Sequence, residues 1–171
     1  MPTPVPGTYP AYFQNYISLV RAASVHEAIE MYSLILDEFF TEINEKKSTF
    51  RYAENKWSIK EVLQHIIDAE RIFAFRALSL ARGEQAPLPG FEENEYAVHS
   101  RADNRSWKSL LDEFLATRKS TDLLLQSFDK SQLQSSGTTN GKPNTVIAIS
   151  FVIIGHALHH LNVVNERYLH S

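Results

Sequence analysis

Apolar residues recur every three or four positions along four long stretches of the chain, which is the spacing of amphipathic helices. We predict helices over residues 24–47, 58–82, 106–128 and 145–169. Each is roughly 35 Å long at a rise of 1.5 Å per residue. No stretch alternates with the two-residue period of a half-buried strand, so a sheet is not expected. Four helices of matched length favour an all-α four-helix bundle.

Polar residues mark the ends of these helices. Ser24 and Ser58 are each followed three positions later by a glutamate, which is the capping-box pattern. Trp57 precedes the second cap, where it can pack onto Val62. Gly83 follows the second helix and predicts a left-handed stop there.

The connections differ in length. Residues 48–57 form a short link, whereas 83–105 and 129–144 are long. Long loops in a compact domain are usually functional or cross one end of the fold, so the helices need not alternate up and down. Residues 9–16 are rich in tyrosine, and we expect them to form a short helix that lays aromatic rings against the outside of the bundle.

Composition narrows the function classes. A chain of 171 residues predicts a single domain over 1–171. The net charge of −3 argues against nucleic-acid binding, which usually needs a basic face. Cysteine is absent, which excludes disulfides, thiolate ligands and a cysteine nucleophile. The N-terminus lacks a signal-peptide pattern, and the apolar run 146–154 is too short to span a bilayer, so we expect a cytoplasmic protein without a membrane partner.

Histidine placement is the strongest chemical signal. His156 and His160 are four residues apart, so they share one face of the last helix. On a wheel of about 100° per residue they lie within the apolar stripe, whereas His159 falls about 80° to the side. His65 lies at the edge of the stripe of the second helix. Two helices would therefore present three imidazoles to one interior.

Three buried rings need partners. Each unpaired polar ring costs on the order of 1–3 kcal/mol in a core, and a divalent cation removes that penalty. Without cysteine the donors are nitrogen and oxygen, and imidazole-rich sites suit Zn, Ni, Fe or Cu. The divalent metals that we expect here are Zn, Ni, Fe or Mn. The alternative is three core histidines that are satisfied by hydrogen bonds, and spacing alone does not decide between the two.

Other polar residues could complete such a site. Asp68 and Arg167 are candidate catalytic residues. Asp68 could act as a general base, or accept a hydrogen bond from the histidine ring nitrogen that does not bind the metal. Arg167 could attract an anionic substrate. Glu166 is another possible acceptor for a ring nitrogen. The competing interpretation is a solvated helix face with local ion pairs, and we favour it for Glu70.

Two stretches carry a family resemblance. They are RYAENKWSIKEVLQH, which ends at His65, and GHALHHLN, which spans residues 155–162. The chain resembles the DinB-like (DNA-damage-inducible) family of bacterial four-helix bundles, which is related to thiol transferases. The resemblance implies that the helix-two histidine and the first and last histidines of the second motif bind a divalent metal, here His65, His156 and His160. Many members carry a glutamine shortly after the last histidine, where this chain has Asn162 and Val163.

The resemblance also implies a function. It points to a metal-dependent hydrolase, or to a transferase that uses a low-molecular-weight thiol, with a small-molecule substrate and a homodimeric assembly. The alternative is a non-enzymatic stress-response or binding module whose metal is structural or absent. An open coordination position beside a pocket would favour the enzyme.

Overall fold

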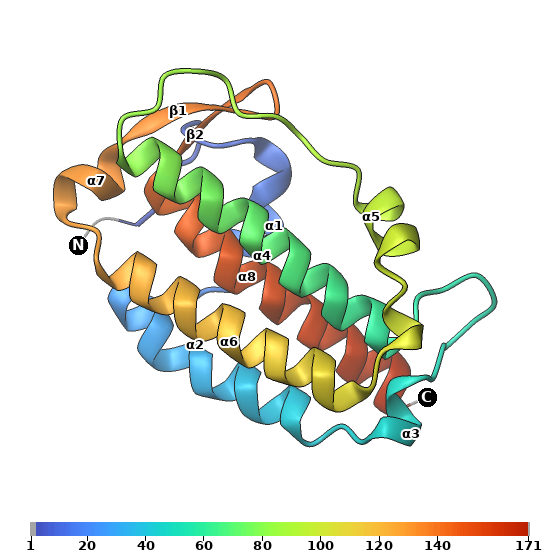
Figure 1. The fold of residues 1–171 in the computed structure, drawn as a ribbon. Helices are drawn as coiled ribbons and strands as arrows, with labels where there is room; N and C mark the ends of the chain where they lie inside the picture. The colour runs from blue at the N-terminus through green and yellow to red at the C-terminus, as the bar shows by residue number, and fades with distance from the viewer. Residues whose placement is uncertain (1–2, 171) are drawn as a thin grey trace.

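The computed structural model describes residues 3–170. Four long helices form the predicted bundle (Figure 1). They are α2 (Val25–Thr41), α4 (Ile59–Ala81), α6 (Trp107–Gln126) and α8 (Val146–Val164), and a π-helical turn over Asn165–Leu169 continues the last.

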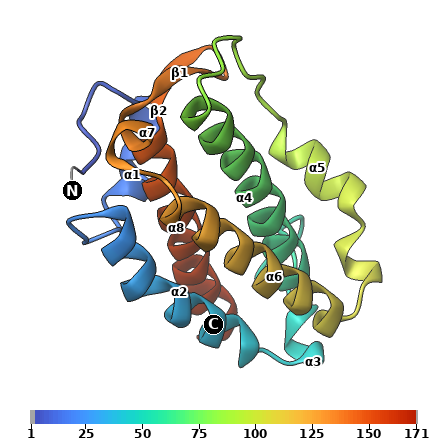
Figure 2. The same cartoon turned by 60° about the vertical axis from the view of Figure 1, so that its left-hand side comes forward.

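The four helices do not alternate in direction. α2 and α8 run one way, while α4 and α6 run the other way (Figures 1 and 2). Both α2 and α4 pack against α6 and α8, so α2 and α4 lie diagonally across the bundle. The segment between α4 and α6 carries α5 (Glu93–Ser100) and the 3-10 turn η2 (Ala102–Asn104), and it returns along the length of the bundle. The predicted crossover in 83–105 is therefore confirmed.

Caps explain where the helices begin and end. Ser58 and Glu61 form the reciprocal capping box at α4, and Gly83 adopts a φ of +83° just after it. Ser24 caps α2 by accepting from the Glu27 N–H. The prediction of one helix over residues 24–47 was wrong at its end. The chain leaves the helix after Thr41, and Asn44 caps a separate short helix, α3 (Glu45–Ser48), because an Asn side chain that binds the backbone favours a new start.

The N-terminal segment packs into the core rather than onto its outside. It contains the 3-10 turn η1 (Ala11–Phe13) and α1 (Gln14–Ile17), and both Tyr9 and Phe13 are buried. Gly155 of α8 allows this approach, because a Cβ atom there would lie 2.1 Å from the Tyr16 carbonyl oxygen. The expected short helix forms and packs against α8, which is apolar around most of its circumference, but Tyr9 and Phe13 are buried in the core rather than lying on its outside.

A small sheet replaces part of the second long loop. After α7 (Lys130–Gln134), strands β1 (Ser136–Thr139) and β2 (Lys142–Thr145) form an antiparallel hairpin. The Leu88 N–H donates to the Thr138 carbonyl and the Asn140 N–H donates to the Leu88 carbonyl, so the hairpin is tied to the crossover. The expectation of no sheet was wrong here, since Asn-Gly at the tip adopts the positive φ angles of a tight turn.

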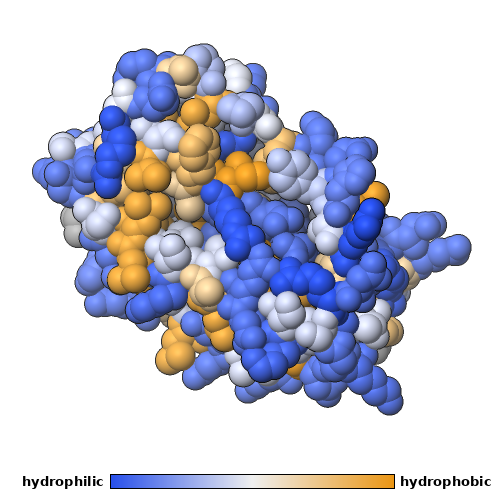
Figure 3. All heavy atoms as spheres, in the orientation of Figure 1, coloured by the Kyte–Doolittle hydropathy of each residue, from blue (hydrophilic) through white to orange (hydrophobic). Residues whose placement is uncertain are grey.

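The last helix forms the centre of the core. The run 146–154 is too short for a span by itself, but by length and composition alone the whole segment Val146–Leu169 is long and apolar enough to cross a membrane. Of its most apolar window, 72% is buried inside the protein, as in the core helix of a soluble protein. The face drawn in Figure 3 is mostly hydrophilic, with hydrophobic side chains gathered on its left side.

One buried charge cluster corrects the interpretation of Glu70 as a solvated residue. Glu70 is only 3% exposed, and its carboxylate accepts from the Arg118 guanidinium at 2.8 Å. A second branch of Arg118 donates to Asp122 at 2.8 Å. α6 thus supplies the cation that keeps a carboxylate of α4 inside the bundle.

Candidate metal centre

Three imidazoles meet between α4 and α8, as the helix wheel predicted. His156 Nε2 lies 3.0 Å from His65 Nε2 and 3.2 Å from His160 Nε2. The three candidate ligand atoms all lie within 4.8 Å of one another. The i, i+4 spacing on α8 directs His156 and His160 to one side, and the packing of α4 on α8 brings His65 to the same point.

The site holds these rings in the neutral form. Burial lowers the pKa of His65 to about 4, helped by the nearby His159. Burial also lowers the pKa of His156 and of His160 well below the usual value, and the neighbouring rings act in the same direction. Neutral imidazole offers a nitrogen lone pair, which is the form that binds metals. The electrostatics therefore favour ligation over protonation.

The spacing fits a small cation. Zinc bound tetrahedrally at about 2.05 Å from each nitrogen would require nitrogens about 3.3 Å apart. The two shorter separations, 3.0 and 3.2 Å, come close to this value. Nitrogens this close repel unless a proton or a cation lies between them, and three nitrogens that converge on one point are better satisfied by one ion.

The outer residues lie less centrally. Asp68 accepts from the Gln64 amide at 2.9 Å, and the structure gives it no bond to His65 among residues 3–170. Glu166 is exposed. Arg167 is exposed and donates to the Tyr52 hydroxyl at 3.3 Å. His159 lies at the flank, with its ring edge-on to His160 at 5.0 Å between centroids.

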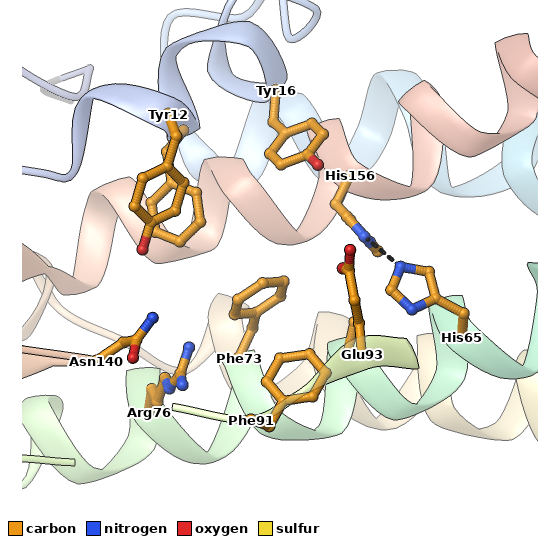
Figure 4. Close-up of a pocket in the computed structure, with 11 residues that line it drawn as sticks. Tyr12, Tyr16, His65, Phe73, Arg76, Phe91, Glu93, Asn140 and His156 are labelled. Carbon is orange, nitrogen blue, oxygen red and sulfur yellow. Dashed lines mark hydrogen bonds between the residues drawn. The ribbon is translucent and has the colours of Figure 1, made fainter. Parts of the chain in front are cut away.

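A cavity of about 290 Å³ opens beside the histidines (Figure 4). His65 and His156 form one end of it, while Arg76 and Asn140 stand at the other. Its walls are largely aromatic and come from η1, α1, α4 and the segment before α5; they include Tyr12, Phe13, Tyr16, Phe73 and Phe91.

Sequence reasoning missed several of these residues. Figure 4 shows the Glu93 carboxylate pointing toward the contact between His65 and His156. Tyr16 stands on the opposite wall, and burial together with the Glu93 charge raises the pKa of its phenol. Arg76 could have been found from its spacing, since eleven residues return to nearly the same face of α4 as His65. Glu93 gave no such signal, because it lies in the crossover.

A second cavity, of about 380 Å³, lies on the other side of the histidines. His159, His160 and Trp57 form part of its wall. Arg167 lines this second cavity, not the aromatic one. The three rings therefore stand between two hollows of the surface.

Two known proteins share features with this chain. A protein of Oceanobacillus iheyensis named "Putative metal-dependent hydrolase" is 28% identical over 83 residues. The match covers 46% of this chain, which spans about half the length of that relative, 47%. YfiT from Bacillus subtilis, described as a probable metal-dependent hydrolase with an unusual four-helix bundle topology, superposes with a TM-score of 0.73 at 13% identity. That superposition covers 98% of this chain and 92% of YfiT, and it shows a shared fold.

The family itself is established by the sequence. The model of the DinB superfamily matches residues 35–164, which contain all three converging histidines, the whole of α4, α6 and α8, and the C-terminal part of α2. The bundle topology found here agrees with the fold shared with YfiT. The chain belongs to the DinB superfamily.

Proposed function

We propose that this protein is a metal-dependent hydrolase whose divalent cation is held by His65, His156 and His160. The observation that carries the proposal is the convergence of three neutral, largely buried imidazoles beside an open cavity. The names of the Oceanobacillus relative and of YfiT point to the same class. A cation on three protein ligands keeps positions free for water or substrate.

The chemistry follows from that open position. When bound, a divalent cation of this kind polarises a substrate carbonyl or phosphoryl oxygen and lowers the pKa of water toward 7. Aromatic side chains line the cavity, and where a bound substrate displaces water between them, electrostatic interactions near the histidines become stronger. Glu93 faces the same end of the cavity and would accept the proton that the attacking water loses. Asp68 and Arg167 stay predictions as outer residues, with Arg167 placed to meet an anion that approaches from the second cavity.

A thiol transferase is the second candidate, because cavities adjoin the histidines on two sides. A group transfer needs two substrates, and a low-molecular-weight thiol could occupy one cavity while its acceptor occupies the other. A non-enzymatic module with a structural metal is less favoured, because no carboxylate joins the three rings as a further ligand among the described residues. Homodimer formation and a cytoplasmic location complete the proposal.

Metal analysis tests the site directly. Protein purified without a histidine tag is expected to bind close to one equivalent of zinc, nickel, iron or manganese. His160→Ala should abolish uptake, whereas His159→Ala should largely retain it, because His159 lies at the flank. Uptake near zero in the wild type, or equal loss in both variants, would contradict the proposed site.

Activity separates the enzyme from the binding module. Zinc-loaded protein should hydrolyse a panel of activated esters and amides, and chelation should remove that activity. Glu93→Gln should retain the metal and lose most of the hydrolysis. If the protein instead consumes a test thiol together with an electrophile, and hydrolyses nothing in the panel, it is a thiol transferase and not a hydrolase.

A further inference from the structure

Arg76 lies far along the aromatic cavity from the histidines. It follows His65 by eleven residues on α4, which is about three turns and roughly 16 Å along the helix axis. The two side chains therefore share one face of α4 and enter the same cavity at opposite ends (Figure 4). Arg76 is only 4% exposed.

The guanidinium of Arg76 is buried without an anion. One nitrogen donates to the Pro89 carbonyl at 2.6 Å, and its Cζ lies 5.8 Å from the centre of the Phe73 ring. Its Nε has no hydrogen-bond partner, and no carboxylate forms an ion pair with it within residues 3–170. Arg118, the other deeply buried arginine, pairs with two carboxylates. A buried cation with a free donor is costly unless a ligand supplies the missing charge.

The neighbourhood of Arg76 is arranged for a polar end group. Asn140, at the tip of the hairpin, presents its amide to the same end of the cavity. Gly90 permits this approach, since a Cβ atom there would lie 2.2 Å from the Asn140 side-chain oxygen. The hydrogen bonds between Leu88 and the hairpin hold both segments in place. Burial lowers the pKa of Arg76, with a smaller opposing effect from Tyr12.

Charge also differs between the two ends. Glu93 places a carboxylate beside the histidines, while Arg76 places a cation at the far end. A ligand with one anionic end would be attracted to Arg76 and repelled by Glu93, which sets its direction. The volume of about 290 Å³ suits a small molecule with one ring between the aromatic walls.

We infer that this cavity binds a small aromatic or apolar substrate through a terminal anionic group, a carboxylate or a phosphoryl group, held by Arg76 and Asn140. The opposite end of that substrate reaches the histidines, and in this respect the inference rests on the proposed function. Arginine recognises both anions through two parallel N–H donors, so the shared chemistry is a planar or tetrahedral oxyanion.

Matched ligands test the anion site without relying on catalysis. Phenylbutyrate, phenylpropylphosphonate and the neutral phenylbutyramide are titrated calorimetrically into metal-free protein, where no cation can bind the acid. Charge-assisted hydrogen bonds predict that at least one acid binds about 10- to 100-fold more tightly than the amide. The tighter of the two acids identifies the anion class.

Variants assign the preference to one side chain. Arg76→Met should remove the preference for the acid, whereas Arg82→Met, which deletes an exposed arginine at the end of the same helix, should retain it. Equal binding of acid and amide by the wild type, or an unchanged preference in Arg76→Met, would overturn the inference. If Arg76→Met does not fold, the wild-type protein provides the test by heteronuclear NMR. The Nε–H signal of Arg76 should shift when the acid is added and not when the amide is added. An unchanged signal with the acid would overturn the inference.

Zinc uptake separates this inference from the proposed function. Arg76→Met should bind zinc as the wild type does, because Arg76 is not a ligand. Acid preference without zinc uptake would support the anion site and refute the hydrolase. Zinc uptake without acid preference would support the metal site of the proposed hydrolase and refute the anion site.

Discussion

The buried guanidinium of Arg118 predicts the largest loss of stability from a single substitution away from the histidines. It is 1% exposed and donates to Glu70 and Asp122, each at 2.8 Å. Arg118→Met keeps much of the apolar volume but removes the cation that forms ion pairs with Glu70 and Asp122. Burial raises the pKa of a third nearby carboxyl, that of Asp37, while Arg118 opposes the rise.

The magnitude follows from the burial of the pair. Breaking a buried ion pair by removing one partner costs about 3–5 kcal/mol, because the remaining charge stays uncompensated. That loss is a large part of a typical stability of about 5–15 kcal/mol. For a chain of this size it corresponds to a fall of roughly 6–20 °C in the melting temperature.

Urea unfolding followed by circular dichroism measures the effect. At pH 7 the free energy of unfolding of Arg118→Met should fall by the stated amount. Lys108→Met is the control, since Lys108 and Asp112 form an exposed pair that contributes at most about 1 kcal/mol. If Arg118→Met stays within 1 kcal/mol of the wild type, the cluster does not stabilise the bundle in the way that its geometry indicates.

Two further predictions concern pH and packing. Because the pKa of His65 falls to about 4 on folding from about 6.5, the unfolded state binds the proton first, so the metal-free protein should lose stability as the pH falls from about 6.5 to 4. At about 1.4 kcal/mol per pH unit this group contributes up to about 3 kcal/mol, and thermal unfolding of His65→Gln should show a shallower pH dependence; an identical slope would contradict the assignment. Gly155→Ala should lower stability by about 1–3 kcal/mol, because its methyl group would overlap the Tyr16 carbonyl and displace α1. Asn162→Ala, at an exposed position of α8, is the control in the same thermal scans. Equal melting temperatures for the two variants would show that α1 can move away from α8 without a loss of stability.

Features that depend on residues close together along the chain could be predicted from the sequence. The periodicity of α4 and the pair Ser58 and Glu61 act within a few residues, so they predict the helix and its start. The spacing of His156 and His160 likewise places them on one face before any tertiary contact forms. The stripe of α4 likewise placed His65 toward the interior, the family resemblance named the same three histidines, and they converge in space.

Contacts between segments far apart along the chain could not be predicted from local patterns. The diagonal arrangement of α2 and α4 follows from a crossover whose path no local pattern specifies. That path brings Glu93 to the histidines, and the hairpin brings Asn140 to Arg76. The pattern of α4 predicts Glu70 to be a surface residue, but Glu70 is buried because Arg118 of α6 forms an ion pair with it. Helical periodicity records how a residue faces its own axis, whereas burial and charge pairing depend on what the other helices place against it.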